Sequence, residues 1–376
     1  MNARIPLLAI ALLNIPAAPA AEVFVDLLNG QDLSGWTNVN CAPETWTWGD
    51  GVVRCTGKPT GALRTLRQYE NFILDLEWRH LKSGGNAGIF IWASPIAAPG
   101  VPFLRAIEVQ VLDHGYGKSD WFTTHGDVFP IHGSTMKPFG RHNGMRSFPS
   151  EERSKGAPEW NHYRITASNG VLRLAVNGKE VSGGEDCVWR KGYLGLESEG
   201  SPTEFRNIRI KELPSSGATA GQSAPLDRNW QSLYNGLDLR GWNLVGSGTN
   251  RWQARDWTLF HSGGVQLGHK LSSQREFGDC ELTWDARVAK SGGAAMLSPL
   301  HVRGMELPAP LAAAAEVTEK WQRFRLTLKG RQMSLQVGDS TPLEASMPES
   351  MPARGSIELT GSGASLEFAN IYVREF

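Results

Sequence analysis

The sequence predicts an all-β protein made of two similar sandwich or jelly-roll domains. Three observations support this: apolar and polar residues alternate, Asn-Gly turns join the alternating segments, and the chain repeats itself. Segments such as "FILDLEW", "IEVQVL", "HYRITAS" and "VLRLAVNG" have the two-residue period of strands with one buried face. "SNGV" and "VNGK" are hairpin turns. No long stretch has the period of a helix.

The first element, residues 1–20, has the pattern of a signal peptide. Arg4 precedes an apolar run from Ile5 to Ile15, and Ala18-Pro19-Ala20 fits the small-residue cleavage rule. The apolar run is too short to span a bilayer as a permanent helix. We therefore expect an exported protein, secreted or periplasmic, that begins at Ala21 and has no membrane span.

An internal repeat then defines the domains. "VFVDLLNGQDLSGW" at 23–36 matches "NWQSLYNGLDLRGW" at 229–242, and at the same offset Trp46 falls on Trp252. "PSSGATAGQSAP" between the copies is rich in small residues and has no apolar pattern. The repeat predicts a first domain at 21–213, a flexible linker at 214–225 and a second domain at 226–376. Each copy should hold roughly a dozen strands.

The charge balance and the tryptophan content limit the classes of molecule that the protein is expected to bind. Lys and Arg number 38 against 38 Asp and Glu, so no basic field indicates nucleic acid or an anionic membrane. The 14 Trp are many for this length. In an exported protein they favour a carbohydrate partner, because indole faces stack on sugars, although most of them are expected in the core. Nothing in the sequence identifies a protein partner.

The cysteines suggest one disulfide. There are four, and an exported protein can form disulfides. Cys41 and Cys55 flank a predicted hairpin, so we expect them to pair. Their spacings do not resemble a zinc site.

The two copies differ by one long segment. Residues from about 94 to 158 correspond to only about 20 residues after Ser298. The second copy closes its sandwich without this segment, so a purely structural role in the first copy is not favoured. Long excursions of this kind are typical of binding loops and lids.

Acidic residues begin this segment, in "EVQVLD". On a regular strand Glu108 and Gln110 share one face and Asp113 lies on the other. Retaining glucanases of the laminarinase type carry E-x-D-x-x-E at this spacing, with a β-bulge that returns the third acid to the first face. Here Gln110 and Asp113 depart from that pattern. The alternative is that Glu108 is a polar strand residue and Asp113 a turn residue.

"HGDVFPIHG" adds His125, Asp127 and His132. Histidine titrates near neutral pH and can move protons or donate to an oxyanion. Histidine and aspartate also bind metals, but no known ligand spacing is matched, so we expect no cofactor and leave a metal open. Lys137 and Arg141 follow and could hold hydroxyls or an oxygen anion; otherwise they are solvated surface charges.

Other strands could line the same polar and aromatic face. "LDLEWRH" carries Arg79, "GNAGIFIW" carries Trp92, and "YLGLESEG" carries Glu197 and Glu199. The alternative is that these are ordinary outward residues.

With these motifs, the first copy resembles the 3-keto-disaccharide hydrolase domain family. The likeness is carried by "FVDLLNGQDLSGW", "GNAGIFIW", "IEVQVLDH", "GDVFPIHG", "EWNHYRI" and "GYLGLESEGSPTEFRNIRIKEL", and it covers nearly all of 22–213. The second copy keeps the framing motifs but lacks "EVQVLD" and "GDVFPIHG", and it resembles a degenerate copy. The resemblance implies a concanavalin A-like jelly roll acting on glycosides whose C3 hydroxyl has become a ketone.

A C3 ketone acidifies the C2 proton, so a base can remove it while donors stabilise the enolate. The resemblance leads us to assign Glu108 as base or proton shuttle, Asp113 as its partner, and His132 as acid or enolate donor with help from Lys137. The residues expected to hold the sugar are Arg79, Trp92, Gln110, His114, Trp121, His125, Asp127, Lys137, Arg141 and Glu197. Two alternatives stay open: a conventional retaining glycosidase and a non-catalytic carbohydrate-binding protein.

Overall fold

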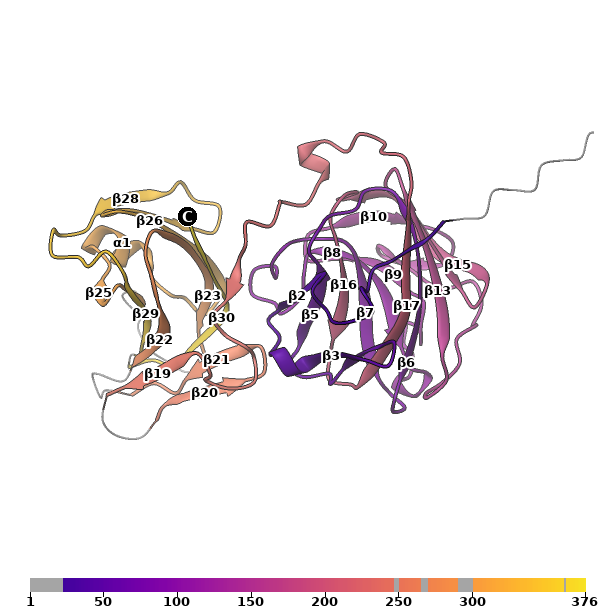
Figure 1. The fold of residues 1–376 in the computed structure, drawn as a ribbon, viewed down its shortest axis with the longest axis horizontal. Helices are drawn as coiled ribbons and strands as arrows, with labels where there is room; N and C mark the ends of the chain where they lie inside the picture. Colours follow the sequence, from indigo (N-terminus) through magenta and orange to yellow (C-terminus); the bar gives the residue numbers. More distant parts are fainter. Residues whose placement is uncertain (1–22, 247–249, 265–269, 290–299, 362) are drawn as a thin grey trace, which may run out of the picture.

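The computed structural model describes residues 23–246, 250–264, 270–289, 300–361 and 363–376. The predicted signal peptide lies outside them. The all-β prediction is confirmed, because four antiparallel sheets make up the structure (Figure 1). The helical elements of these residues are short: η1 (Pro43–Thr45), η2 (His114–Tyr116), η3 (Ala220–Gln222) and α1 (Ala309–Ala314). None of the described helices has the length and apolarity to cross a bilayer.

Residues 23–213, here called the first half, form a nine-stranded and an eight-stranded sheet. In spatial order the nine-stranded sheet contains β10 (Thr135–Pro138), β15 (Lys179–Val188), β14 (Val171–Val176), β13 (Asn161–Ser168), β6 (Phe72–His80), β17 (Thr203–Glu212), β4 (Val52–Cys55) and β3 (Trp46–Gly49), with β1 (Val25–Asp26) paired to β17. The eight-stranded sheet contains β11 (His142–Asn143), β12 (Arg146–Ser147), β9 (Val128–Ile131), β8 (Ala106–Leu112), β7 (Asn86–Ala93), β16 (Tyr193–Ser198), β5 (Gly61–Thr65) and β2 (Trp36–Val39).

Residues 226–376, the second half, form an eight-stranded and a five-stranded sheet. The larger contains β20 (Trp252–Arg255), β21 (Thr258–His261), β30 (Leu366–Glu375), β23 (Cys280–Val288), β26 (Gln322–Lys329), β27 (Gln332–Val337) and β28 (Leu343–Ser346), with β18 (Gln231–Ser232) paired to β30. The smaller contains β19 (Trp242–Val245), β22 (Lys270–Phe277), β29 (Gly355–Thr360), β24 (Leu300–Val302) and β25 (Met305–Glu306).

The core of the first half lies between its two sheets. Ile89 of β7, Val109 of β8 and Leu196 of β16 point into it. Because side chains alternate along a strand, Gly88, Glu108 and Glu197 project from the opposite side of the eight-stranded sheet. This side is called the carboxylate face below.

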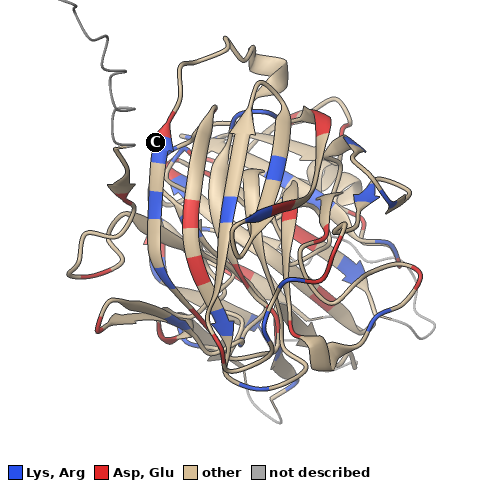
Figure 2. Ribbon diagram, turned by 90° about the vertical axis from the view of Figure 1, so that its right-hand side faces the viewer, with Lys and Arg blue, Asp and Glu red and all other residues tan. Residues whose placement is uncertain are grey.

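The outer face of the nine-stranded sheet is covered by paired charges. Asp75 pairs with Arg164, Glu77 with Arg206, and Glu204 with Arg79. Figure 2 views the molecule from this side and shows acidic and basic residues interspersed along the strands. This face lies on the other side of the core from the carboxylates, and its charged side chains pair with one another.

The second half packs on the carboxylate face of the first. Tyr372 of β30 joins a cluster with Ala62, Phe90 and Ala106 of the first half. The Tyr372 hydroxyl donates to Asn40 Oδ1 at 2.7 Å. Figure 1 shows the two halves side by side, with β2, β5 and β16 of the first half turned toward the second.

A buried aspartate organises this contact. Asp285 is fully buried and forms a two-point ion pair with Arg323, at 2.7 and 2.9 Å. Its Oδ2 also accepts from Gly100 N at 2.8 Å, and Arg323 Nη1 donates to Ala97 O at 2.9 Å. The pair therefore connects the second half directly to the 94–105 connection between β7 and β8.

The expected Cys41–Cys55 disulfide is not present. Both residues are buried free thiols, as are Cys187 and Cys280. Cys41 Sγ lies 3.9 Å from Pro59 O, whereas Cys55 Sγ accepts from Gly57 N at 3.3 Å. The two sulfur atoms thus contact different parts of the same loop rather than each other.

Asp285→Ala should destabilise the protein strongly, because it leaves the Arg323 guanidinium buried without its counter-charge. We expect a loss of about 3–5 kcal/mol in the free energy of unfolding. Urea titration followed by tryptophan fluorescence measures it. Arg240→Ala, which removes an exposed ion pair between the halves with Glu44, is the control and should cost less than about 1 kcal/mol. Equal costs for the two variants would contradict this view of the interface.

Candidate active site

Two glutamates meet above a glycine at the centre of the carboxylate face. Glu108 of β8 and Glu197 of β16 lie on either side of Gly88 on β7, because β7 pairs with both strands. A Cβ on Gly88 would lie 2.8 Å from Glu108 Oε1 and 2.9 Å from Glu197 Oε2. Only a residue without a side chain leaves room for both carboxyl groups, so the glycine is part of the site.

Both glutamates of this pair have raised pKa values. Burial and then the charge of Glu199 raise the pKa of Glu108 to about 8. Burial and then the charge of Glu108 raise the pKa of Glu197 well above its ordinary value. Neighbouring buried carboxyls cannot all ionise, so they share protons at neutral pH. Glu197 Oε2 is also buried and has no hydrogen-bond partner among the described residues.

Glu199 is the third carboxyl of the cluster. Burial raises its pKa to about 7, although hydrogen bonds from Asn86 and Glu197 oppose the shift. Asn86 Nδ2 donates to Glu199 Oε2, and Gln110 Nε2 donates to Asn86 Oδ1 at 2.9 Å. Gln110 therefore lies on the same face as Glu108, as predicted, and connects β8 with β7 and Glu199.

Arg146 of β12 brings a positive charge to the cluster. Its charge lowers the pKa of Glu108 against the effect of burial. Its Nη1 donates to Asp127 Oδ2 at 3.1 Å, and its guanidinium lies 3.3 Å from the ring centre of Phe129. Asp127 is completely buried and also accepts from Thr123 N at 3.0 Å. Asp127 thus holds Arg146 beside the carboxylates.

Asp113 does not join Glu108. Strand β8 pairs with β7 without a register shift, so the bulge of the glucanase pattern is absent here and Asp113 follows the strand as a cap. Its carboxylate accepts from the backbone N–H of Gly84, Gly115 and Ala157 at 2.7–2.8 Å. Burial would raise its pKa, but these hydrogen bonds lower it overall. Asp113 is placed to hold loops together.

Other residues of the segment lie in separate contacts. His132 is on an exposed turn and stacks on Phe103, with ring centres 6.1 Å apart. Lys137 belongs to the nine-stranded sheet and pairs with Glu185 at 2.6 Å. Arg141 lies over the ring of Phe148, and Trp121 is 71% exposed. None of these contacts brings the four residues to Glu108.

Two predicted sugar contacts from the strands occupy other places. Arg79 is on the outer face of the nine-stranded sheet, where it pairs with Glu204 at 2.7 Å. Trp92 is completely buried in the core and donates to Glu70 O at 2.8 Å. Trp92 has a positive φ of 54°, and this local distortion turns its side chain inward. Neither residue lies on the carboxylate face.

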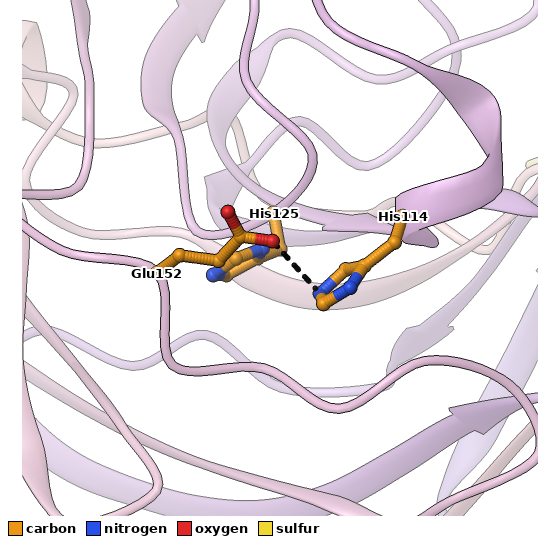
Figure 3. A group of neighbouring side chains, drawn as sticks. All are labelled: His114, His125 and Glu152. Atoms are coloured by element: carbon orange, nitrogen blue, oxygen red, sulfur yellow. Dashed lines mark ion pairs between the residues drawn. The ribbon is translucent and has the colours of Figure 1, made fainter.

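His114, His125 and Glu152 form a group that could hold a metal ion, with one potential ligand atom from each within 4.8 Å of the others. Figure 3 shows the two imidazoles and the carboxylate close together. Burial and then the charge of His114 lower the pKa of His125 to about 4, so its ring is neutral at pH 7. However, its Nε2 accepts from Arg153 N and Ser154 N at 3.2 and 3.3 Å, and its Nδ1 contacts Thr124 Oγ1. A metal would have to displace these hydrogen bonds.

A cavity of about 810 Å³ lies between the halves, but its lining does not include the carboxylates. Thr37 and Asn38 line it from the first half, and Tyr234 and Arg275 from the second. These side chains offer hydrogen bonds but no pair of buried carboxyl groups, so the carboxylate face is the candidate site for acid–base chemistry.

Sequence reasoning missed Arg146, placed Asn86 on the right strand face without including it among the site residues, and left Glu199 undecided. The one signal for Glu199 was its two-residue spacing from Glu197, which places both on the same side of a strand. Arg146 comes from a short strand whose neighbour in the sheet, β9, precedes it by 15 residues. No local pattern indicates that arrangement.

Replacing Glu108 tests its protonation. Its folded pKa is about 8, against an ordinary value of 4.5, so the folded state binds this proton more tightly than the unfolded chain. The resulting stabilisation is complete below pH 4.5 and is lost as the pH rises through 8. Glu108→Gln stays neutral, so we expect its Tm to exceed that of the wild type by about 3 °C at about pH 9 and to match it in acid.

Thermal unfolding across this pH range is the measurement. Glu77→Gln, on the outer face of the other sheet, is the control and should give no gain at high pH. If Glu108→Gln has the same pH profile as the wild type, Glu108 ionises normally and the shared-proton description fails.

The chain is similar to several known proteins. A 3-keto-disaccharide hydrolase of Bacteroides thetaiotaomicron is 24% identical over 234 residues, covering 51% of this chain and 79% of that protein. A Parabacteroides distasonis protein assigned as a glycosyl hydrolase is 22% identical with a TM-score of 0.42, covering 52% of this chain and 95% of that one. The carbohydrate binding module CBM66 from Bacillus subtilis is 15% identical with a TM-score of 0.34, covering 47% and 96%.

The sequence model of the 3-keto-alpha-glucoside-1,2-lyase-like domain matches residues 23–211. The match contains the whole carboxylate face and covers half of the chain. The chain therefore belongs to the 3-keto-alpha-glucoside-1,2-lyase-like domain family.

Proposed function

We propose that the first half cleaves the glycosidic bond of 3-keto-glycosides by C2 proton abstraction, elimination and hydration. The observation that carries this proposal is the pair of buried, proton-sharing carboxyls of Glu108 and Glu197 above Gly88. A base for a C2 proton works best with a pKa near the working pH. An isolated surface glutamate has a pKa far below this, whereas burial raises the pKa of Glu108 to about 8 and that of Glu199 to about 7.

The reaction uses one ionised and one protonated carboxyl. The ionised member removes the proton from C2, and the C3 ketone accepts the electron pair as an enolate. The enolate then expels the C1 oxygen, which takes a proton from the protonated member. Water adds to C1, a proton returns to C2, and the products are the 3-keto sugar and the alcohol. Neither carboxyl attacks C1, so a carboxylate nucleophile of low pKa is not required.

Arg146 and the amide groups would stabilise the enolate oxygen. Arg146 uses Nη1 for Asp127, which leaves its other nitrogen atoms for a developing negative charge. Asn86 and Gln110 extend the polar surface next to Glu199. In this proposal Asp113 positions the surrounding loops, and Arg146 takes the role that the sequence had suggested for His132 and Lys137.

We also propose that the second half is a degenerate copy of the first, without the carboxylate site. Matching residues support the copy: Trp36 Nε1 donates to Leu27 O at 3.0 Å, and Trp242 Nε1 donates to Leu233 O at 2.7 Å. Asn207 and Asn370 also correspond, with φ of 53° and 52°.

The direct test uses the protein starting at Ala21, given 3-keto-trehalose and trehalose in parallel. We expect glucose release from the keto substrate alone, and in D2O the released 3-keto sugar should carry deuterium at C2. Glu108→Gln and Glu197→Gln should each lower kcat by about 100-fold or more. Cleavage of trehalose itself would favour a conventional glycosidase, and binding without cleavage of either sugar would favour a lectin.

Gly88→Ala tests the geometry of the pair. The added methyl would lie within 3 Å of both carboxyl oxygens, so the two side chains must move apart, whereas the backbone of this strand accepts alanine. We expect kcat to fall by about 100-fold with the fold retained by circular dichroism. Gly35→Ala, whose methyl would approach nothing closer than Leu27 O at 3.7 Å, should keep full activity. Full activity of Gly88→Ala would rule out a close Glu108–Glu197 pair as the catalytic unit.

A further inference from the structure

The tip of the β20–β21 hairpin in the second half rests on the first half just before β5, the strand that pairs with β16 at Glu197. Asp256 at the tip accepts from Thr60 N and from Thr60 Oγ1, both at 2.7 Å. Thr60 directly precedes β5, where Ala62 pairs with Glu197. Tyr234 also fixes the tip, since its hydroxyl lies 2.9 Å from Asp256 O. The hairpin therefore ends at the strand next to Glu197.

Trp321 makes a second contact with the first half, at the connection between β7 and β8. It directly precedes β26, and its Cβ lies 2.6 Å from the position that a Cβ on Gly100 would take. Gly100 belongs to the connection between β7 and β8, the strands that carry Gly88 and Glu108. The Gly100 N–H bond to Asp285 keeps this contact in place.

Trp257, next to the Asp256–Thr60 contact, and Trp321, at the Gly100 contact, have their rings against each other. Their ring centres are 5.5 Å apart with planes tilted by 39°, and both side chains are half-buried. The guanidinium of Arg287 lies 4.7 Å from the Trp321 ring centre. Within the described ranges neither indole N–H has a hydrogen-bond partner, so each can donate to a ligand.

The hairpin itself does not need a tryptophan. The corresponding turn of the first half is Asp50–Gly51, and Asp50 and Asp256 both have a φ of 54°. Asp-Gly is a favoured hairpin turn, whereas Asp256–Trp257 places the largest side chain at the tip. The second copy thus replaces the residue that suits folding with one that suits stacking.

We propose that Trp257 and Trp321 form an aromatic subsite that the second half contributes to the carboxylate face. It would bind the sugar on the leaving-group side of the scissile bond by stacking on its apolar face. This inference rests on the proposed function of the carboxylates. It gives the second half a role in the selection of disaccharides over glycosides with a small leaving group.

The experiment compares 3-keto-trehalose with methyl 3-keto-α-glucoside, which lacks the second sugar. Trp257→Ala and Trp321→Ala should each raise the KM for 3-keto-trehalose about tenfold, or about 1.4 kcal/mol, with kcat nearly unchanged. Both constants for the methyl glycoside should match the wild type, and Trp257→Phe should recover part of the affinity. Phe376→Ala, an exposed aromatic of the second half, is the matched control.

Three outcomes would overturn the subsite: an unchanged KM for 3-keto-trehalose, an equal rise in KM for both substrates, or a loss of kcat alone. Failure of the wild type to cleave either substrate would instead contradict the proposed function. In that case 3-keto-trehalose is titrated against wild type and Trp257→Ala by tryptophan fluorescence. A weaker Kd in the variant would support the subsite, and equal Kd values would overturn it.

Discussion

The burial of Glu108 beside Glu197 is the constraint on which the rest of the structure depends. Two carboxyl groups withdrawn from water and close together cannot both carry charge, so the sheet holds them partly protonated. Gly88 leaves room for both carboxyl groups. The charge of Glu199 raises the pKa of Glu108 further, and the positive charge of Arg146 lowers it. The same burial that weakens folding at alkaline pH would, in the proposed reaction, supply an acid and a base together near neutral pH.

The second half packs against the carboxylate face, and no pattern in its sequence predicts this contact. It covers part of the carboxylate face through Tyr372 and is held there by the Asp285–Arg323 pair, which is shared with the backbone of Ala97 and Gly100. A buried ion pair adds little net stability, but its directional bonds restrict the ways in which two surfaces can fit. The fixed orientation brings the β20–β21 hairpin tip against Thr60 and Trp321 against Gly100 of the first half.

The sequence indicated several residues whose positions turned out to be different. The E-x-Q-x-x-D spacing predicted Asp113 beside Glu108, which requires a β-bulge, but β8 pairs with β7 without one. Arg79 was placed by alternation on a polar face, but β6 belongs to the other sheet, so that face lies across the core. Trp92 would have faced the carboxylates on a regular strand, and its positive φ turns it inward. The alternation of residues along a strand predicts which side chains share a face, but it does not predict which sheet the strand joins.

By itself, the sequence determined the all-β class, the resemblance to the family, and the presence of Glu108, Gln110 and Glu197 on strand faces. These follow from local periodicity and from motifs that are short along the chain. Only the tertiary structure decided that Gly88, Glu108 and Glu197 are neighbours, that Glu199 and Arg146 complete their surroundings, and that the hairpin with Asp256 comes from far along the chain to contact Thr60. The physical reason is that β16 begins 100 residues after β7 ends (193 − 93) and still pairs with it, with Leu196 opposite Ile89. Pairing between strands so distant leaves no periodic pattern in the sequence.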